Sequence, residues 1–211
     1  VMAVAKGKDS KRKGFFGYTA LHILRDCPSA VWLVTPESAA KINHVLGCVD
    51  VSSEQPVDSE LNDKVFELAD SISRYQDARY SILHAWRMQD EAVLSSRLPR
   101  EQVAGFVKDH AKATEKQFDE FLKSHGSQVE SENVHLLKGR AAETVENFVR
   151  DNSVDLVVMG TVGRSGVSGI LLGNTAERIL DRIECSVLAL KPYDFTSSIK
   201  LKRNRETSQA R

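Results

Sequence analysis

The sequence predicts an α/β protein: a five-stranded parallel sheet with helices on both faces, preceded by part of a second copy of the same module. Short apolar runs alternate with segments of helical periodicity from residue 44 to residue 190. These runs are apolar on both of their alternating faces, which indicates strands that are covered by helices from both sides. The third observation is an internal repeat, in which the first residues match the end of the later module.

The elements follow one another in regular order along the second part of the chain. Five apolar runs are expected to form strands, and they cover residues 44–50, 80–86, 134–137, 154–159 and 186–190. Between them, apolar residues at helical spacing predict helices over 61–72, 103–122, 141–152 and about 175–183. This alternation favours a parallel sheet, because parallel neighbours need a crossover connection.

The beginning of the chain repeats the end of this module. The matching segments are 1–3 with 158–160, 17–24 with 173–180, and 27–34 with 185–190. Three matches in the same order indicate an internal repeat, and an apolar run at position 1 indicates that its upstream part is missing. The expected divisions are the end of a first module at 1–36, a linker at 37–43, a complete second module at 44–192, and a basic, disordered tail at 193–211.

Charge and cysteine content argue against several classes of protein. Basic and acidic residues number 29 each among 211 residues, so the chain lacks the basic excess of a nucleic-acid or anionic-membrane binder. Cys27, Cys48 and Cys185 form no metal-binding or disulfide pattern and are expected to be free thiols. No apolar run approaches the roughly 20 residues that span a bilayer. The N-terminus does not resemble a signal peptide, so the cytoplasm is the expected location.

A glycine-rich loop follows the fourth predicted strand, over Gly160–Thr175. It holds five glycines within fourteen residues and leads directly into a helix. Glycine lets a ligand approach the main chain closely, and the amide groups at a helix N-terminus favour an anion. Arg164 and the hydroxyls of Thr161, Ser165 and Thr175 can add hydrogen bonds. This composition suits a phosphate, although the loop matches neither the Walker nor the dinucleotide pattern.

Two interpretations of the loop stay open on its composition alone, a phosphate site and a glycine-rich surface loop without a ligand. The expected topology favours the first. If the fourth strand returns to the other side of the first, a crevice opens between the carboxyl ends of these two strands, where ligands of open α/β sheets bind. Asp50 ends the first strand and would line this crevice together with Gly160, although a helix cap or turn is the alternative role for Asp50.

These residues taken together resemble the universal stress protein family. Gly160, Gly163 and Gly173 match the Gly-x2-Gly-x9-Gly spacing of its nucleotide-binding members. The acid after the first strand, the end of the second strand and the closing strand correspond to Asp50, His84-Ala85 and Cys185-Ser186-Val187. The likeness covers residues 44–191 completely and 1–34 as a partial first module, as in the tandem-domain type of the family.

The resemblance implies a fold shared with adenine nucleotide alpha hydrolases and a site for ATP or a related adenine nucleotide, with or without Mg²⁺. Adenosine would lie near Asp50 and the Ala85 backbone, and the phosphates would meet the glycine loop. The implied nucleotide-binding residues are Asp50, Ala85, Met159, Gly160, Gly163, Arg164, Gly173, Asn174 and Thr175. The family also pairs modules through the last strand, so we expect either a homodimer or pairing of 31–34 with 187–190 within one chain.

Two departures from the family pattern concern the loops. Asn174 stands where the motif has serine or threonine, and an amide can still donate to a phosphate oxygen. In the first module Ala3 and Lys6 replace the first two glycines and Gly17 falls one residue late. We therefore expect that the first loop does not hold a nucleotide in the same manner.

Catalytic motifs are not visible in the sequence. There is no GxSxG and no P-loop lysine, and His84 and His135 fall within strand patterns, which favours packing roles. The first hypothesis is a non-catalytic, nucleotide-binding stress-response protein. The second is a module of the same fold that has lost ATP and acts through protein partners, dimerisation or another ligand. The third is a slow ATPase. We rank them in that order.

Overall fold

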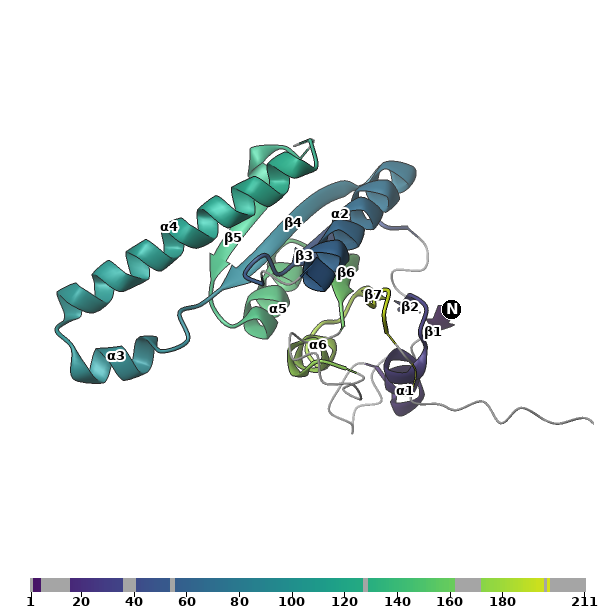
Figure 1. The fold of residues 1–211 in the computed structure, drawn as a ribbon. Helices are drawn as coiled ribbons and strands as arrows, with labels where there is room; N and C mark the ends of the chain where they lie inside the picture. The colour runs from purple at the N-terminus through teal and green to yellow at the C-terminus, as the bar shows by residue number, and fades with distance from the viewer. Residues whose placement is uncertain are drawn as a thin grey trace, which may run out of the picture.

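One mixed sheet forms the centre of the molecule (Figure 1). The computed structural model describes residues 2–4, 16–35, 41–53, 56–126, 129–161, 172–195 and 197. The strands are β1 (Met2–Val4), β2 (Val31–Val34), β3 (His44–Val49), β4 (Arg79–Trp86), β5 (Val134–Lys138), β6 (Leu156–Gly160) and β7 (Ser186–Leu190). Their order across the sheet is β1-β2-β7-β6-β3-β4-β5.

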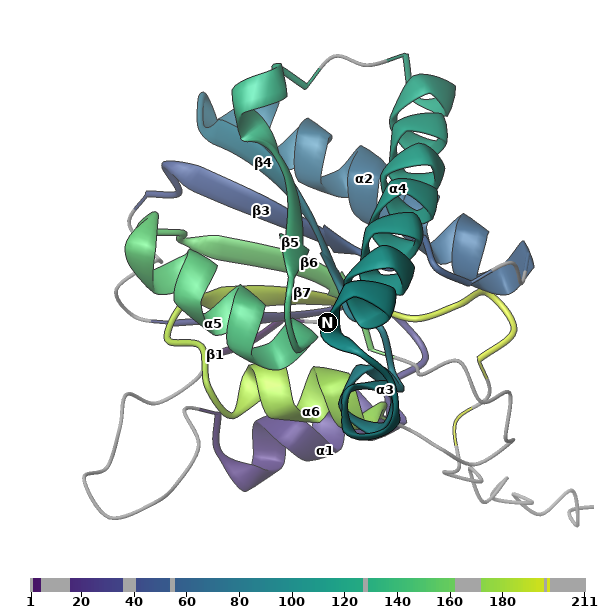
Figure 2. The same cartoon turned by 90° about the vertical axis from the view of Figure 1, so that its left-hand side faces the viewer.

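Helices cover both faces of this sheet, as predicted (Figure 2). The helices are α1 (Tyr18–Asp26), α2 (Pro56–Gln76), α3 (Glu91–Arg97), α4 (Arg100–Ser124), α5 (Ala141–Asp151) and α6 (Asn174–Leu180), with a short 3-10 helix, η2 (Ser131–Asn133). Residues of α1, α5 and α6 contribute to the core on one face, and residues of α2 and α4 contribute to the core on the other. Among the described residues, no helix is both long and apolar enough to cross a membrane.

The middle strands are buried on both faces, which explains their continuous apolar sequence. Along β6, Leu156 and Val158 face the core beneath α2, whereas Val157 and Met159 face the core beneath α5 and α6. All four side chains are buried. A strand in this position cannot show the polar alternation of a half-exposed strand, and its apolar run is the pattern from which it was predicted.

The prediction of a five-stranded, purely parallel sheet is wrong in strand number and direction. The five predicted strands are present as β3 to β7 and are parallel to one another, but β1 and β2 extend the same sheet. β2 runs antiparallel to β7, with Val31 opposite Ala189 and Leu33 opposite Val187. By pairing with β7, β2 satisfies main-chain groups that would otherwise be unpaired along the outer edge of β7.

Side chains reinforce the seam between the first segment and the rest of the chain. The Thr35 N–H donates to Ser186 Oγ at 3.0 Å. Lys191 Nζ donates to the Arg25 carbonyl at 2.9 Å, at the last turn of α1, and burial lowers the pKa of Lys191 to about 8. Arg25 in turn donates to Glu177 Oε1 of α6 at 2.6 Å. The α1 helix is therefore tied to both β7 and α6.

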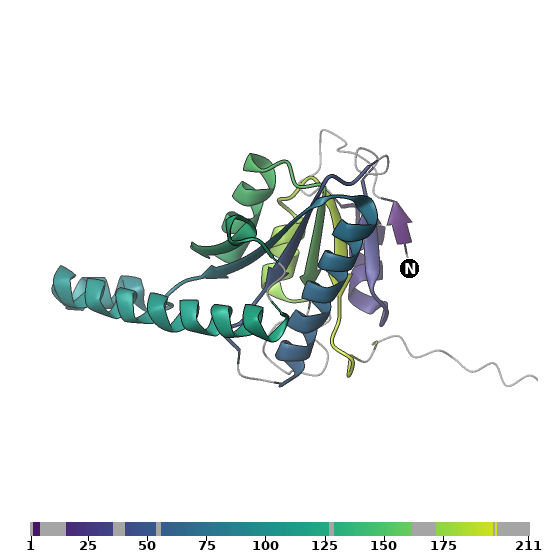
Figure 3. The ribbon, with the colours of Figure 1, turned by 90° about the horizontal axis from the view of Figure 1, so that it is seen from above.

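The helix predicted over 103–122 is longer than expected and is preceded by a second helix. Pro99 caps α4, and α3 lies before it, so the two helices form an arm that projects from the sheet (Figure 3). Two contacts hold the base of the arm. Lys138 Nζ donates to Glu91 Oε1 at 2.7 Å, and the Trp86 and His110 rings lie 5.6 Å apart between centroids.

Candidate functional site

The strand order creates a switch point between β3 and β6. β4 and β5 lie on one side of β3, whereas β6 and β7 lie on the other, and these five strands are parallel. Cys48 pairs with Met159, so the ends of β3 and β6 lie side by side. Asp50 follows the first of these strands and Thr161 the second. The topology thus has the crevice position at which open α/β sheets bind ligands.

Asp50 lies at this edge and is exposed to solvent. Its main-chain N–H donates to Asn62 Oδ1 at 3.0 Å, and Asn62 Nδ2 donates to the Asp50 carbonyl at 2.9 Å. Its Oδ1 accepts from the Ser52 N–H at 3.2 Å and from Ser52 Oγ at 2.5 Å. The carboxylate is therefore held in a defined direction at the carboxyl end of β3.

The base of the glycine-rich loop is closed by hydrogen bonds between described residues. Thr161 is 1% exposed, and both its N–H and its Oγ1 donate to the Leu190 carbonyl, at 2.9 and 3.0 Å. The Gly173 N–H donates to the Thr161 carbonyl at 2.7 Å. The chain that leaves β6 and the chain that enters α6 therefore meet beside the end of β7. Gly163 and Arg164 lie outside the described residues.

Gly160 is required for helix packing as well as being a candidate ligand contact. A Cβ atom at this position would lie 2.6 Å from Leu61 Cδ2 of α2. Its φ falls outside the left-handed region, so the backbone conformation alone would accept another residue. From the sequence, Gly160 is predicted to contact the ligand, and the contact with Leu61 is a separate reason for a glycine at this position.

Ala85 and Met159 reach the crevice edge in different ways. Ala85 follows His84, which pairs with Val49, so it lies on the neighbouring strand beside Asp50. Its side chain is half-buried. The Met159 side chain is 3% exposed and packs in the core on the α5 and α6 face, which leaves the main chain for any ligand contact.

Asn174 and Thr175 begin α6 and are both exposed. The residue before them, Gly173, caps this helix without a side-chain hydrogen bond. Hydroxyl and amide donors are therefore presented at the point where the glycine-rich loop ends.

His84 and His135 occupy strands, as expected. The buried His84 ring lies 5.9 Å from the Phe118 ring between centroids, and its Nδ1 is 3.1 Å from the Val49 carbonyl. Within the described part of the chain, no group of three or more histidine, cysteine or acidic residues is arranged to hold a metal ion. These positions are typical of packing residues.

A histidine pair lies on the α5 face of the sheet. His44 and His135 both pack against Phe148 of α5, with ring centroids 6.3 and 4.5 Å away. His44 Nδ1 lies 3.0 Å from the Asn152 carbonyl, and its Nε2 lies 2.9 Å from Ser81 Oγ. Burial lowers the pKa of both histidines, so both are neutral in the fold at pH 7.

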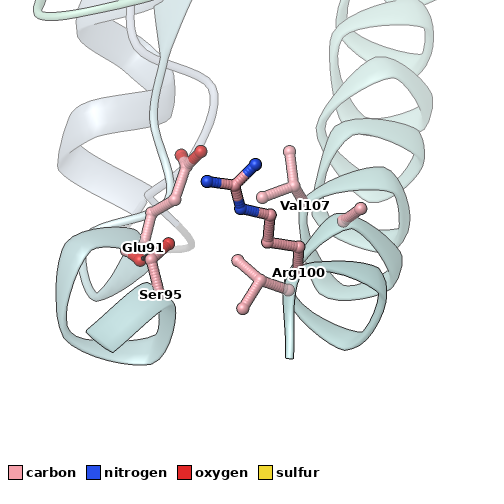
Figure 4. A pocket seen from close by; sticks show the side chains of 6 residues that line it. Glu91, Ser95, Arg100 and Val107 are labelled. Carbon is pink, nitrogen blue, oxygen red and sulfur yellow. Dashed lines mark hydrogen bonds between the residues drawn. The ribbon is translucent and has the colours of Figure 1, made fainter. Parts of the chain in front are cut away.

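Two shallow cavities were not predicted, and one of them lies beside the chain that follows β3. One, of about 310 Å³, lies between α3 and α4, where Glu91 and Ser95 face Arg100 and Val107 (Figure 4). The other, of about 250 Å³, lies between α2 and α4 and includes Asn62. The first cavity could have been anticipated from Pro99, because proline commonly precedes or begins a helix and so marks the boundary between α3 and α4.

Fold and site together define a class of protein: an open α/β sheet with a topological switch point between β3 and β6 and, beside it, a glycine-rich segment whose described ends are joined by a hydrogen bond. The model of the universal stress protein family matches residues 41–191. The match covers most of the chain, and the chain belongs to the universal stress protein family.

Relatives of known name are similar over nearly the whole chain. Universal stress protein E of Escherichia coli strain K12 is 27% identical over 213 residues, which cover 95% of this chain and 63% of the relative. The universal stress protein E homolog of Haemophilus influenzae is 26% identical over 200 residues, with 90% and 62% covered. The chain thus spans less than two thirds of the length of these relatives.

Solved structures share the fold. A protein of unknown function from Pseudomonas aeruginosa PAO1 superimposes with a TM-score of 0.72 at 23% identity, covering 92% of this chain and 63% of that one. A universal stress protein from Archaeoglobus fulgidus gives a TM-score of 0.59 at 18% identity, covering 90% and 62%. At these identities the likeness concerns the fold alone.

Proposed function

We propose that this chain is a non-catalytic stress-response protein that binds ATP or a related adenine nucleotide at the Gly160–Thr175 loop, with or without Mg²⁺. The observation that carries the proposal is the closure of the loop base. The Gly173 N–H donates to the Thr161 carbonyl at 2.7 Å, directly beside the strand end that bears Asp50. A loop anchored in this way can present main-chain amides to a phosphate with little loss of conformational entropy.

The described residues fit such a ligand. Asp50 offers a carboxylate to hydroxyl or amino groups of an adenosine, and Ala85 leaves its neighbouring main chain sterically open because its side chain is a single methyl group. Asn174 and Thr175 supply exposed donors where α6 begins. In this proposal Arg164 adds a positive charge to the phosphate side.

Catalysis is not part of the proposal. His84 is buried against Phe118 with its Nδ1 3.1 Å from the Val49 carbonyl, and His135 packs against Phe148, so both histidines have packing roles. We propose that the nucleotide acts as a conformational ligand, with slow hydrolysis as the outcome to be excluded by phosphate release. The three free cysteines support a reducing compartment, the cytoplasm.

We also propose that last-strand pairing is intramolecular and that residues 1–36 are the end of a first module. The support for pairing is that β7 has β6 on one edge and β2 on the other. The support for the repeat is the ordered sequence match between the two halves. A homodimer would then use another surface.

Calorimetry with ATP and magnesium tests the nucleotide site. Gly163→Val places a branched side chain in the loop and is expected to abolish binding, whereas the wild type binds in the micromolar range. The matched control is Gly105→Val, because a Cβ atom at that glycine meets nothing within 4 Å. If the control and the wild type are folded and neither binds, the proposal is wrong.

One observation favours the second function, contact with a protein partner. The α3–α4 arm projects from the sheet and carries Val93 and Phe106, each 49% exposed. Exposed apolar residues on a projecting element favour protein contacts. Loss of a co-purifying partner on Phe106→Ser, with nucleotide affinity unchanged, would support this alternative.

A further inference from the structure

Two consecutive residues on the second turn of α2 contact the two sides of the crevice. Leu61 packs over Gly160 at the end of β6, where an added Cβ atom would lie 2.6 Å from Leu61 Cδ2. Asn62 contacts the chain directly after β3. One helical turn therefore fixes the ends of both strands that border the switch point.

Asn62 is a buried polar side chain, 8% exposed, on a helix face whose other buried residues are apolar except Ser73. Its Oδ1 accepts from the Asp50 N–H at 3.0 Å and its Nδ2 donates to the Asp50 carbonyl at 2.9 Å. A primary amide carries an acceptor oxygen and donor N–H groups on one planar unit, so it can satisfy a main-chain donor and a main-chain acceptor at once. The peptide groups on both sides of the Asp50 Cα are therefore held by a single side chain.

This two-bond clamp determines where the Asp50 carboxylate points. With both neighbouring peptide groups fixed, the Cα–Cβ direction is fixed too, and Ser52 holds Oδ1 from the other end. The carboxylate is exposed, yet it is already held in one direction before a ligand binds. Preorganisation of this kind increases affinity because less entropy is lost on binding.

We propose that Asn62 is a positioning residue of the nucleotide site and that it acts through Asp50 without touching the ligand. This inference rests on the proposed nucleotide function. Asn62→Ala is expected to weaken ATP binding about tenfold, the change that corresponds to losing the net effect of one or two hydrogen bonds. The same substitution in an Asp50→Ala background is expected to change the affinity by less than about twofold, since the group that it positions is then absent.

Calorimetry on the wild type, the two single variants and the double variant measures this coupling. Asn62→Asp provides a second variant of the same size, which keeps the acceptor for the Asp50 N–H but loses the donor to its carbonyl; it is also expected to weaken binding. Asn152→Ala is the matched control, because Asn152 also donates to a main-chain carbonyl, that of Phe148 at 3.0 Å, but lies at the end of α5. Its ATP affinity is expected to equal that of the wild type.

A measurement without ligand tests the clamp itself. Amide hydrogen exchange at Asp50 is expected to be faster in Asn62→Ala than in the wild type and unchanged in Asn152→Ala. Unchanged exchange, or a wild type and an Asn62→Ala variant that bind ATP equally, would overturn the inference while the proposed function stands. A folded wild type that does not bind ATP would overturn the proposed function, and the nucleotide role of Asn62 with it.

Discussion

The contact between Gly160 and Leu61 gives the sharpest prediction about packing. An alanine methyl at position 160 would lie 2.6 Å from Leu61 Cδ2, whereas carbon atoms in good contact are about 3.5–4.0 Å apart. Leu61 is 7% exposed and belongs to the core beneath α2, so it has little room in which to withdraw. Gly160→Ala should therefore lower the free energy of unfolding by about 1–3 kcal/mol, the usual cost of overpacking.

A double-mutant cycle separates this steric effect from other consequences of the substitution. Leu61→Ala alone should cost about 2–5 kcal/mol, because it leaves a cavity in the core. In that background Gly160→Ala should be nearly neutral, since the clashing atoms are gone and alanine is less flexible than glycine in the unfolded chain. Urea unfolding of the four proteins, followed by circular dichroism, measures the coupling. An equal cost of Gly160→Ala in both backgrounds would refute the steric explanation.

The histidine pair predicts acid sensitivity: because burial lowers the pKa of His44 and His135, the unfolded chain binds more protons below its ordinary histidine pKa of about 6.5. Stability should fall as the pH drops from 7 to 5, and urea midpoints should fall less in His135→Phe; a parallel loss in both proteins would contradict this. The folded pKa of Lys191, about 8, lies below its unfolded value, so the stability of the wild type should rise relative to Lys191→Met between pH 7 and pH 10. If the stability difference between the wild type and Lys191→Met does not change with pH, burial of the Lys191 ammonium does not lower its pKa. Arg25→Gln should cost about 0.2–1 kcal/mol, as for other partly exposed ion pairs. A double-mutant cycle with Glu177→Gln should show that the two costs are not additive.

Most of the strands could be predicted because burial on both faces leaves a signal that does not depend on the neighbour. Residues 156–160 form an apolar run because helices cover both faces of β6, and this run can be recognised without knowing that β3 and β7 are its neighbours. Pairing of residues 31–34 with 187–190 was one expectation from the sequence, but its antiparallel direction was not predicted, because apolar periodicity does not report strand direction. The helix α3 was missed because its residues carry no buried side chain that would impose a period.

The candidate site could be predicted at its strand ends but not in its supporting contacts. The acid at position 50 follows an apolar run, which marks a strand end directly. Asn62 was missed because a polar residue within a helix is usually exposed, and only its spacing to Phe66, Ala69 and Ser73 places it on the buried face. Gly160 was assigned to a ligand because a sequence cannot distinguish a glycine that admits a ligand from one that admits Leu61.

The reversal of direction between β2 and β7 gives the sheet two opposite polarities. β1 and β2 are parallel to each other and antiparallel to β7, so their carboxyl ends lie at the edge where β3 to β7 begin. The chain that leaves β1 after Val4 and the chain that leaves β6 after Gly160 therefore depart from opposite rims of the sheet. The two strands that match each other in the sequence, β1 and β6, thus end on opposite sides of one sheet.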